Sequence, residues 1–289
     1  MNEQQKGIHY FPGHMKKALI SLSRYISTVD LVIEVVDSRA PFSSRNPLLT
    51  KEIGSKAHLL FLTKLDRADS SLTAEWISYY EKHGLRAIAS NLKREKALPL
   101  IAKESEALLK NKREKERKLG MKEQPIRLLV TGVPNVGKST LINNLAGKTI
   151  AIAGNRPGVT RAEQWIKLSS GFILLDTPGI LPMNYGSRDE AVRLALTGSI
   201  KEEVLPLDHL AGALLDYLRQ YYPQILAIRY DIPSLKALTN DEVLLQIGKK
   251  RGYLLQGAMV DTSKAASLLI KEFRDGELGR VTLEVPSAN

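Results

Sequence analysis

The chain has 289 residues, contains no cysteine, and carries a net charge of +11 from 42 Lys and Arg against 31 Asp and Glu. The lack of cysteine excludes a disulfide framework and thiolate metal sites, and it is typical of a reducing cytoplasm. No stretch reaches the roughly 18 apolar residues of a membrane span, and the N-terminus lacks the apolar run of a signal peptide. We therefore expect a soluble cytoplasmic protein, long enough for two domains.

In chain order, the first informative segment is an apolar strand that ends in a polar turn. Residues 58–62 (HLLFL) lead into Thr63, Lys64, Leu65 and Asp66. A carboxylate at such a place suits guanine, because it accepts hydrogen bonds from both the ring N1–H and the exocyclic amine. We expect Asp66 to read the guanine edge and the Lys64 stem to lie over the ring. Taken alone, the turn is equally well explained as a surface turn.

Two further segments belong to this N-terminal part. In residues 86–90 (RAIAS), Ser90 is expected to offer backbone donors to the guanine carbonyl, with Ala89 beside it in the same site. Residues 103–124 hold eight Lys or Arg and five Glu, with almost no aromatic content. Such a composition predicts a solvated helix or a flexible linker.

The most specific motif is a glycine-rich loop after the apolar strand 126–131. Residues 132–139 (GVPNVGKS) fit the pattern G-x-x-x-x-G-K-[ST], in which glycines let backbone amides and a helix N-terminus approach phosphate oxygens. Lys138 is expected to neutralise the β- and γ-phosphates, and Ser139 to ligate Mg²⁺. The alternative is a plain glycine-rich turn. The other residues assigned to this site are Asn135, Val136, Gly137 and Thr140.

Two later segments are suited to sensing the terminal phosphate. Thr160, in the polar stretch 156–160, is expected to give Mg²⁺ a second hydroxyl, although a plain connecting loop also fits. Asp176 ends the strand 172–175 and is expected to hold the metal through water, while the Gly179 amide senses the γ-phosphate. The next residue is Ile180, which cannot orient water, so either the catalytic group comes from elsewhere or the chain is a weak hydrolase.

These motifs do not stand in their usual order, because the base-reading turn and the segment of Ser90, which usually come last, precede the phosphate loop. We interpret the chain as circularly permuted, which a sheet tolerates when its old ends are joined and its new ends are exposed. The predicted fold class is α/β: a permuted, doubly wound, mostly parallel GTPase sheet over residues 1–182. A small all-helical domain is expected over residues 183–289.

The C-terminal part shows apolar residues at helical spacing. Asp189 or Asp208 is expected to open helices, and further helices are predicted over 241–248 and 263–274. Core packing explains these stripes better than a cofactor pocket does. The recurring apolar positions are Ala191, Leu194, Ala195, Leu210, Leu214, Leu215 and Leu218.

The positive charge is uneven along the chain. Residues 1–182 carry 29 Lys and Arg against 17 Asp and Glu, and residues 183–289 carry 13 against 14. An excess of this size favours a phosphate-rich partner, with solubility alone as the alternative. In the nearly neutral tail, the best RNA-binding candidates are Lys249, Lys250 and Arg251, beside an aromatic residue. A basic turn that caps a helix fits them nearly as well.

Taken together, these motifs resemble the circularly permuted YlqF/YawG GTPases, within which one group acts in ribosome biogenesis. The resemblance covers nearly the whole chain and includes residues 10–15 (YFPGHM) and 37–41 (DSRAP). Thr63 departs from the pattern, because many relatives have Asn there, and Ala89 stands where a small polar residue is common. A Thr hydroxyl still hydrogen-bonds a neighbouring loop, but it lacks the paired donor and acceptor of an amide.

The resemblance also implies roles that the residues alone leave open. His14 and His9 are both candidates to act on water, and a lone His is more often structural; the resemblance points to His14 as the catalytic residue. Asn135 resembles the asparagine that helps bind K⁺ in cation-activated GTPases, where the cation supplies charge that an arginine otherwise supplies. A simple turn-forming role for Asn135 is the alternative.

The functional expectation is a GTP-binding and GTP-hydrolysing factor in late maturation of the large (50S) ribosomal subunit. GTP would order the segments of Thr160 and Gly179 for binding to the particle and its rRNA, and hydrolysis would release the factor. Neither DNA nor a membrane is expected as a partner. The alternatives are an RNA-binding scaffold with an idle nucleotide site, and a GTPase of RNA modification or translation.

Overall fold

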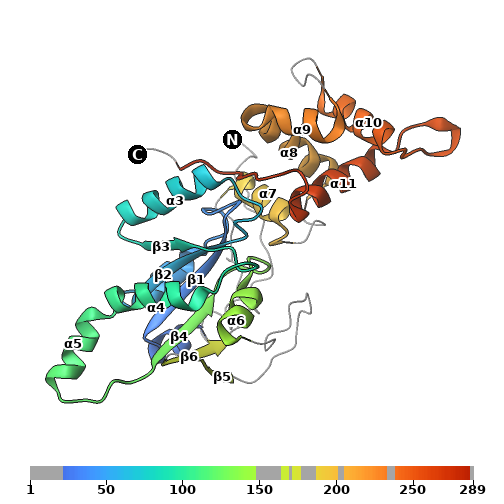
Figure 1. Cartoon of the computed structure of the whole chain (residues 1–289). Helices are drawn as coiled ribbons and strands as arrows, with labels where there is room; N and C mark the ends of the chain where they lie inside the picture. The colour runs from blue at the N-terminus through green and yellow to red at the C-terminus, as the bar shows by residue number, and fades with distance from the viewer. Residues whose placement is uncertain are drawn as a thin grey trace, which may run out of the picture.

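A computed structural model describes residues 22–147, 164–168, 171–176, 187–200, 205–232 and 238–286. Over these residues, six strands form one sheet in the order β3-β2-β1-β4-β6-β5 (Figure 1). All neighbouring pairs are parallel except β5 and β6, so the predicted mostly parallel sheet is confirmed. The strands are β1 (Leu31–Asp37), β2 (Ala57–Thr63), β3 (Arg86–Ala89), β4 (Ile126–Thr131), β5 (Gln164–Lys167) and β6 (Phe172–Asp176).

Helices cover both faces of this sheet, as a doubly wound fold requires. Successive side chains of β1 alternate in direction: Ile33 packs in the cluster that holds helices α4 and α6, and Val32 packs with α2 and residues 22–28, which are also helical. On that second face, Val36 packs with Trp76 of α3. The helices of this part are α2 (Pro47–Ile53), α3 (Ser70–Lys82), α4 (Ala97–Leu108), α5 (Lys110–Lys118) and α6 (Lys138–Ala146).

The segment predicted to join the permuted ends contains the end of α4 and the whole of α5. Lys112 Nζ lies 2.6 Å from Asp30 Oδ1, and Arg127 Nη2 lies 3.0 Å from the same oxygen. Burial alone would raise the pKa of Asp30, but hydrogen bonds from Arg127 and Lys112 lower it from 3.8 to about 2. Because α5 is tied to the sheet in this way, the helical alternative is correct for residues 110–118 and the flexible one is not.

The C-terminal part is helical, as predicted. Helices were expected over 241–248 and 263–274, and both stretches lie inside observed helices. The start of α7 is capped by Ser187, whose hydroxyl accepts from Glu190 N at 3.2 Å, so Asp189 lies in the first turn instead of at the cap. Asp208 likewise lies inside the first turn of its helix. The helices are α7 (Arg188–Thr197), α8 (Leu207–Tyr221), α9 (Pro223–Tyr230), α10 (Asn240–Lys250) and α11 (Thr262–Asp275).

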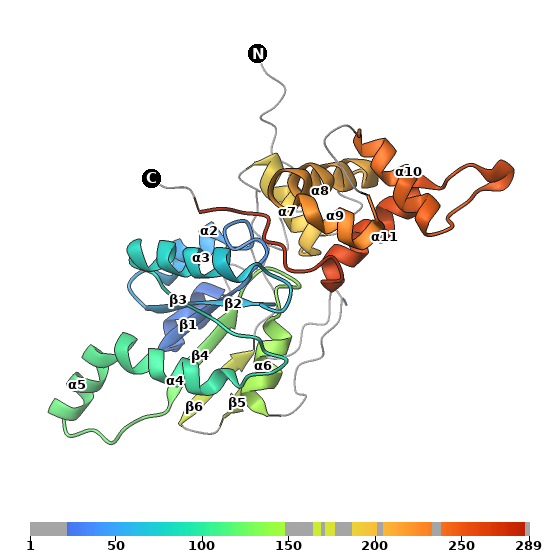
Figure 2. The ribbon, with the colours of Figure 1, turned by 45° about the horizontal axis from the view of Figure 1, so that its top comes forward.

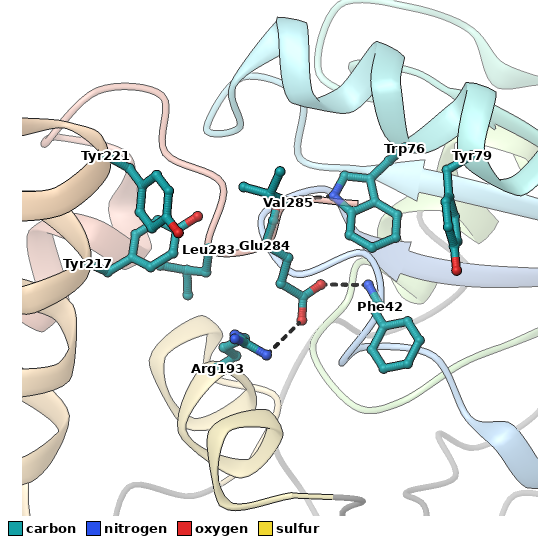
Figure 3. Close-up of a pocket in the computed structure, with 9 residues that line it drawn as sticks. All are labelled: Phe42, Trp76, Tyr79, Arg193, Tyr217, Tyr221, Leu283, Glu284 and Val285. Carbon is teal, nitrogen blue, oxygen red and sulfur yellow. Dashed lines mark hydrogen bonds and ion pairs between the residues drawn. The ribbon is translucent and has the colours of Figure 1, made fainter. Parts of the chain in front are cut away.

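After α11 the chain returns to the sheet. Val281 N donates to Arg67 O at 3.0 Å, and Leu283 N donates to Arg39 O at 2.7 Å. The buried Glu284 carboxylate accepts from Phe42 N at 2.6 Å and lies 3.8 Å from Arg193 of α7 (Figure 3). The final segment therefore fastens the helical part to the loops that follow β1 and β2.

Two sequence predictions concern the limits of these parts. The expected domain boundary at residue 182 lies in 177–186, outside the described residues, so the division into 1–182 and 183–289 stays a prediction. Across the described ranges, none of the helices combines the length and the apolar character that crossing a bilayer needs.

Candidate nucleotide site

The phosphate loop follows β4, in the centre of the sheet, and runs directly into α6. Both of its flanking glycines have a positive φ, and a neighbouring group approaches each of them closely. Gly132 has φ +150°, and a Cβ there would lie 2.3 Å from Val35 O at the end of β1. Gly137 has φ +106°, and a Cβ there would lie 3.1 Å from Thr63 Oγ1. The loop therefore packs closely against the ends of β1 and β2. The start of α6, with its backbone amides, lies at the same edge of the sheet, and this arrangement fits a phosphate group.

Thr63, the departure from the family pattern, touches this loop directly. Its buried hydroxyl contacts Val136 O in the phosphate loop and lies 3.1 Å from Val36 O. The expectation that a Thr hydroxyl can bond a neighbouring loop is confirmed. One hydroxyl proton serves one acceptor at a time, however, so the second bond of an amide is missing.

Lys64 forms a second tie between the base-reading turn and the phosphate loop. Its Nζ donates to Asn135 O at 2.6 Å and lies 2.8 Å from Asp37 Oδ2. Lys64 itself has φ +59°, so the turn bends the side chain back toward β1. The amine is thus anchored at the phosphate loop, and its stem spans the distance from β2 to that loop.

Asp37 and Arg39 were not expected to organise the site, because the sequence identified them only as part of a signature. Arg39 Nη2 lies 2.7 Å from Asp37 Oδ2, and both side chains are buried. Burial alone would raise the pKa of Asp37, but Arg39 and Lys64 hold it well below its usual range. The sequence did contain a signal for this pair: Asp37 and Arg39 carry opposite charges two residues apart, where an apolar strand ends.

The predicted guanine-reading carboxylate lies at the same edge. Asp66 is half-buried, and its Oδ2 lies 2.7 Å from Lys93 Nζ in the loop after β3. Burial alone would raise the pKa of Asp66, but Lys93 and Arg67 lower it, so the group is an ionised acceptor at neutral pH. This state is the one that can accept two donors from guanine. Leu65 lies between Lys64 and Asp66 in the turn.

The loop after β3 is arranged differently from the prediction. The Ser90 amide donates to Leu62 O at 3.2 Å, which extends the pairing of Ala89 and Leu62, so this amide is not available to guanine. The Ser90 hydroxyl donates to Glu95 Oε2 at 2.7 Å. Glu95 also accepts from the Asn91 amide at 3.1 Å, so the acidic side chain holds the loop closed.

The remaining phosphate-loop residues lie where the motif predicts. Lys138 begins α6, with its Nζ 2.7 Å from Val133 O, and Ser139 and Thr140 follow in the first helical turn. Asn135 has φ +59°, a backbone conformation that Asn tolerates well, and its Nδ2 donates to Gly198 O at 2.7 Å. Asn135 therefore does form the turn. Its side-chain nitrogen is bonded to Gly198 O, and its side-chain oxygen can accept from another partner.

Several predicted residues cannot be placed. His14, Thr160 and Gly179 lie outside the described residues. The backbone of Asp176 ends β6 opposite Val130, in the strand that precedes the phosphate loop, and the metal-holding role of its carboxylate stays a prediction. Among the described side chains there is no group of three His, Asp or Glu residues that would hold a metal on its own.

The candidate RNA-binding cluster lies far from this edge, at the end of α10. Arg251 Nη2 lies 2.8 Å from the buried Glu272, and its guanidinium lies over Tyr230. Lys250 Nζ lies 3.2 Å from Asp231 on the surface, and Lys249 is exposed. Arg251 therefore fits the helix-capping interpretation: it is the C-cap of α10, and its charge is paired with the buried Glu272.

The sheet, the phosphate loop and the base-reading turn that precedes it define a circularly permuted P-loop GTPase. Residues 127–226 match the family described as 50S ribosome-binding GTPase. The chain is 43% identical to ribosome biogenesis GTPase A of Bacillus cereus, over 96% of this chain and 94% of that protein. It is 34% identical to the protein of the same name from Thermotoga maritima, over 96% and 94%.

Solved structures agree with this result. The GDP-bound structure of Thermotoga maritima YlqF matches with a TM-score of 0.65 and 30% identity, over 92% of this chain and 99% of that one. The GNP-bound form matches with a TM-score of 0.64, also at 30% identity, over 94% and 100%. The chain belongs to the ribosome biogenesis GTPase A family.

Proposed function

We propose that this GTPase is an assembly factor for the large ribosomal subunit, which binds the late precursor in its GTP state and leaves on hydrolysis. The observation that carries the proposal is the family relationship over nearly the whole chain, together with a phosphate loop that Thr63 and Lys64 tie to the guanine-reading turn. The excess of positive charge over residues 1–182 supports a partner rich in phosphate. The factor would act in the cytoplasm.

In this proposal the nucleotide is GTP, with Asp66 reading guanine and Lys138 on the terminal phosphates. Ser139, Thr160 and Asp176 would hold Mg²⁺, which neutralises phosphate charge when bound. The proposal is supported by Ser139, which lies in the first turn of α6 beside the phosphate loop, and by the backbone of Asp176, which ends β6 next to the strand that precedes this loop. K⁺, held by Asn135, would add to this charge.

The catalytic residue in this proposal is His14, which would orient water because Ile180 cannot. Intrinsic turnover should then be slow and rise when the precursor particle positions His14. The test is His14→Ala, measured with and without large subunits. If this variant binds GTP normally and keeps full stimulated turnover, His14 has no part in the reaction.

The experiment that tests the function itself is the GTP hydrolysis rate in KCl buffer with purified large subunits, with small subunits, and with neither. Stimulation by large subunits alone is expected. An equal rate in all three conditions would contradict an assembly role that depends on the particle.

A scaffold with an idle nucleotide site is the second candidate, and the single-hydroxyl tie of Thr63 together with Ile180 favours it. Lys138→Ala separates the two candidates. A cell that depends on this variant should accumulate large-subunit precursors if GTP is needed, and it should assemble subunits normally if the chain is only a scaffold.

A further inference from the structure

The segment that links α10 to α11 projects from the helical part, and both views show it extending away from the other helices (Figures 1 and 2). Its tip carries three large apolar side chains that face solvent. Leu254 is 58% exposed, Leu255 50% and Met259 64%. Grouped exposed apolar residues of this kind mark contact surfaces more often than isolated ones do.

The projecting segment is a hairpin held by backbone hydrogen bonds. Leu254 pairs with Val260 in an antiparallel bridge, and Leu255 N donates to Met259 O at 2.7 Å. Its base is fitted tightly to α10, because a Cβ on Gly248 would lie 2.3 Å from Val260 Cγ1. The tip is thus presented in a fixed conformation, which lowers the entropic cost of binding.

The hairpin and the start of α11 carry more positive than negative charge. Residues 248–264 contain four cations and one carboxylate, that of Asp261, which accepts from Lys264 N at 2.9 Å at the start of α11. Arg251 and Lys250 are paired with Glu272 and Asp231, as described above. Lys249 and Lys264 form no ion pair with a carboxylate of the described residues, and Lys264 Nζ lies 4.5 Å from the centre of the Tyr253 ring.

Cations at the base and apolar groups at the tip match a nucleic acid better than a protein pocket, since phosphates meet the cations while bases receive the apolar groups. Apolar side chains act as wedges between partly unstacked bases, and RNA offers such bases in its loops and bulges. A hydrophobic pocket on a protein would account for the leucines but not for the excess of cations beside them.

We propose that this hairpin docks on ribosomal RNA of the large subunit, with Leu254, Leu255 and Met259 packed against unstacked bases and with Lys249 and Lys264 on phosphates. This inference rests on the proposed function and names the element that makes the RNA contact. It assigns the phosphate contacts to Lys249 and Lys264, whereas the sequence favoured Lys249, Lys250 and Arg251.

The test uses the full chain, loaded with a non-hydrolysable GTP analogue, and purified large subunits, with affinity measured over a series of KCl concentrations. The tip variant carries Leu254→Ser, Leu255→Ser and Met259→Ser. It should bind at least about tenfold more weakly, because base packing is lost, with an unchanged salt dependence. The matched control is Ile228→Ser, since Ile228 is 82% exposed on α9 of the same part; it should bind like the wild type.

The lysine variant, Lys249→Ala with Lys264→Ala, should instead change the salt dependence of binding. Loss of two phosphate contacts should reduce the slope of log affinity against log salt by about 1.4, at about 0.7 per phosphate of a single strand. An unchanged slope would overturn the role of the two lysines. Melting temperatures equal to that of the wild type will show that the variants fold.

Chemical probing of base reactivity in the bound subunit identifies the partner. The wild type should change the reactivity of a few bases, and the tip variant at saturating concentration should not. Weaker binding of the tip variant with an unchanged base pattern would show a protein partner and overturn the RNA assignment. Unchanged binding of the tip variant would overturn the inference alone, whereas failure of the wild type to bind large subunits would overturn the proposed function as well.

Discussion

The side-chain amide of Asn135, in the phosphate loop, donates to the backbone carbonyl of Gly198 at 2.7 Å, at the end of α7. The neighbouring carbonyls at this helix end are also occupied: Arg274 donates to Leu196 O at 3.0 Å, and Arg39 donates to Thr197 O at 3.3 Å. A helix C-terminus attracts such donors because its carbonyls lack partners within the helix. One helix end therefore connects the phosphate loop, the loop after β1 and α11.

The first prediction separates the two roles of Asn135. Asn135→Gly keeps the left-handed backbone but removes the amide, so hydrolysis should lose its stimulation by K⁺ over Na⁺ if Asn135 helps hold the cation. If Asn135 only forms the turn, the glycine variant will respond to K⁺ like the wild type. Asn135→Ala is the companion variant, and its strained backbone should cost about 1–2 kcal/mol in the free energy of unfolding.

The second prediction concerns the hydroxyl of Thr63. Thr63→Val keeps the shape but leaves Val136 O without this donor, so affinity for GTP and GDP should fall about five- to tenfold, as expected for about 1 kcal/mol. The preference for GTP over ATP should not change. Thr63→Ser keeps the hydroxyl and serves as the control. Equal affinities for the valine and serine variants would show that the contact does not support the loop.

The third prediction tests Asp66 as the guanine reader. Asp66→Asn loses an acceptor for the two donors of guanine, so GTP affinity should fall by roughly 100-fold, while the affinity for xanthosine triphosphate, whose ring carbonyl suits an amide donor, should rise. Lys93→Ala removes only the ion pair of an exposed lysine and should have a small effect. A parallel loss of affinity for both nucleotides would speak against base reading by Asp66.

The fourth prediction uses the acidity of Asp30, whose folded pKa is about 2 against an ordinary 3.8. Because folding lowers this pKa, the ionised carboxylate stabilises the fold above pH 3.8, and that contribution is lost as the pH falls toward 2. Asp30→Asn should cost about 1–2 kcal/mol in urea unfolding at pH 6, after allowance for the exposure of its partners, and progressively less toward pH 3.

Glu75→Gln, an exposed change on α3, gives the control for the loss of a negative charge. A difference between wild type and Asp30→Asn that stays constant over this pH range would contradict the linkage to Asp30.

Local sequence patterns predicted much of the fold. The apolar strand before residues 132–139 and the turn after residues 58–62 both lie where expected, at one edge of a parallel sheet. The helices over 241–248 and 263–274 followed from spacing alone. These features are readable because strand alternation, helical periodicity and glycine positions each depend on residues within a few places of one another.

Contacts between distant residues were decided only by the tertiary structure. Asn135 donates to Gly198 O, Arg251 forms an ion pair with Glu272, and Glu284 accepts from Phe42 N. No local sequence pattern links the two members of any of these pairs. Buried charges and free carbonyls must find partners, but which partners they find depends on how the packed helices bring the chain together. The sequence alone determined the chemistry of the nucleotide site, whereas packing decided which residues connect that site to the helical part.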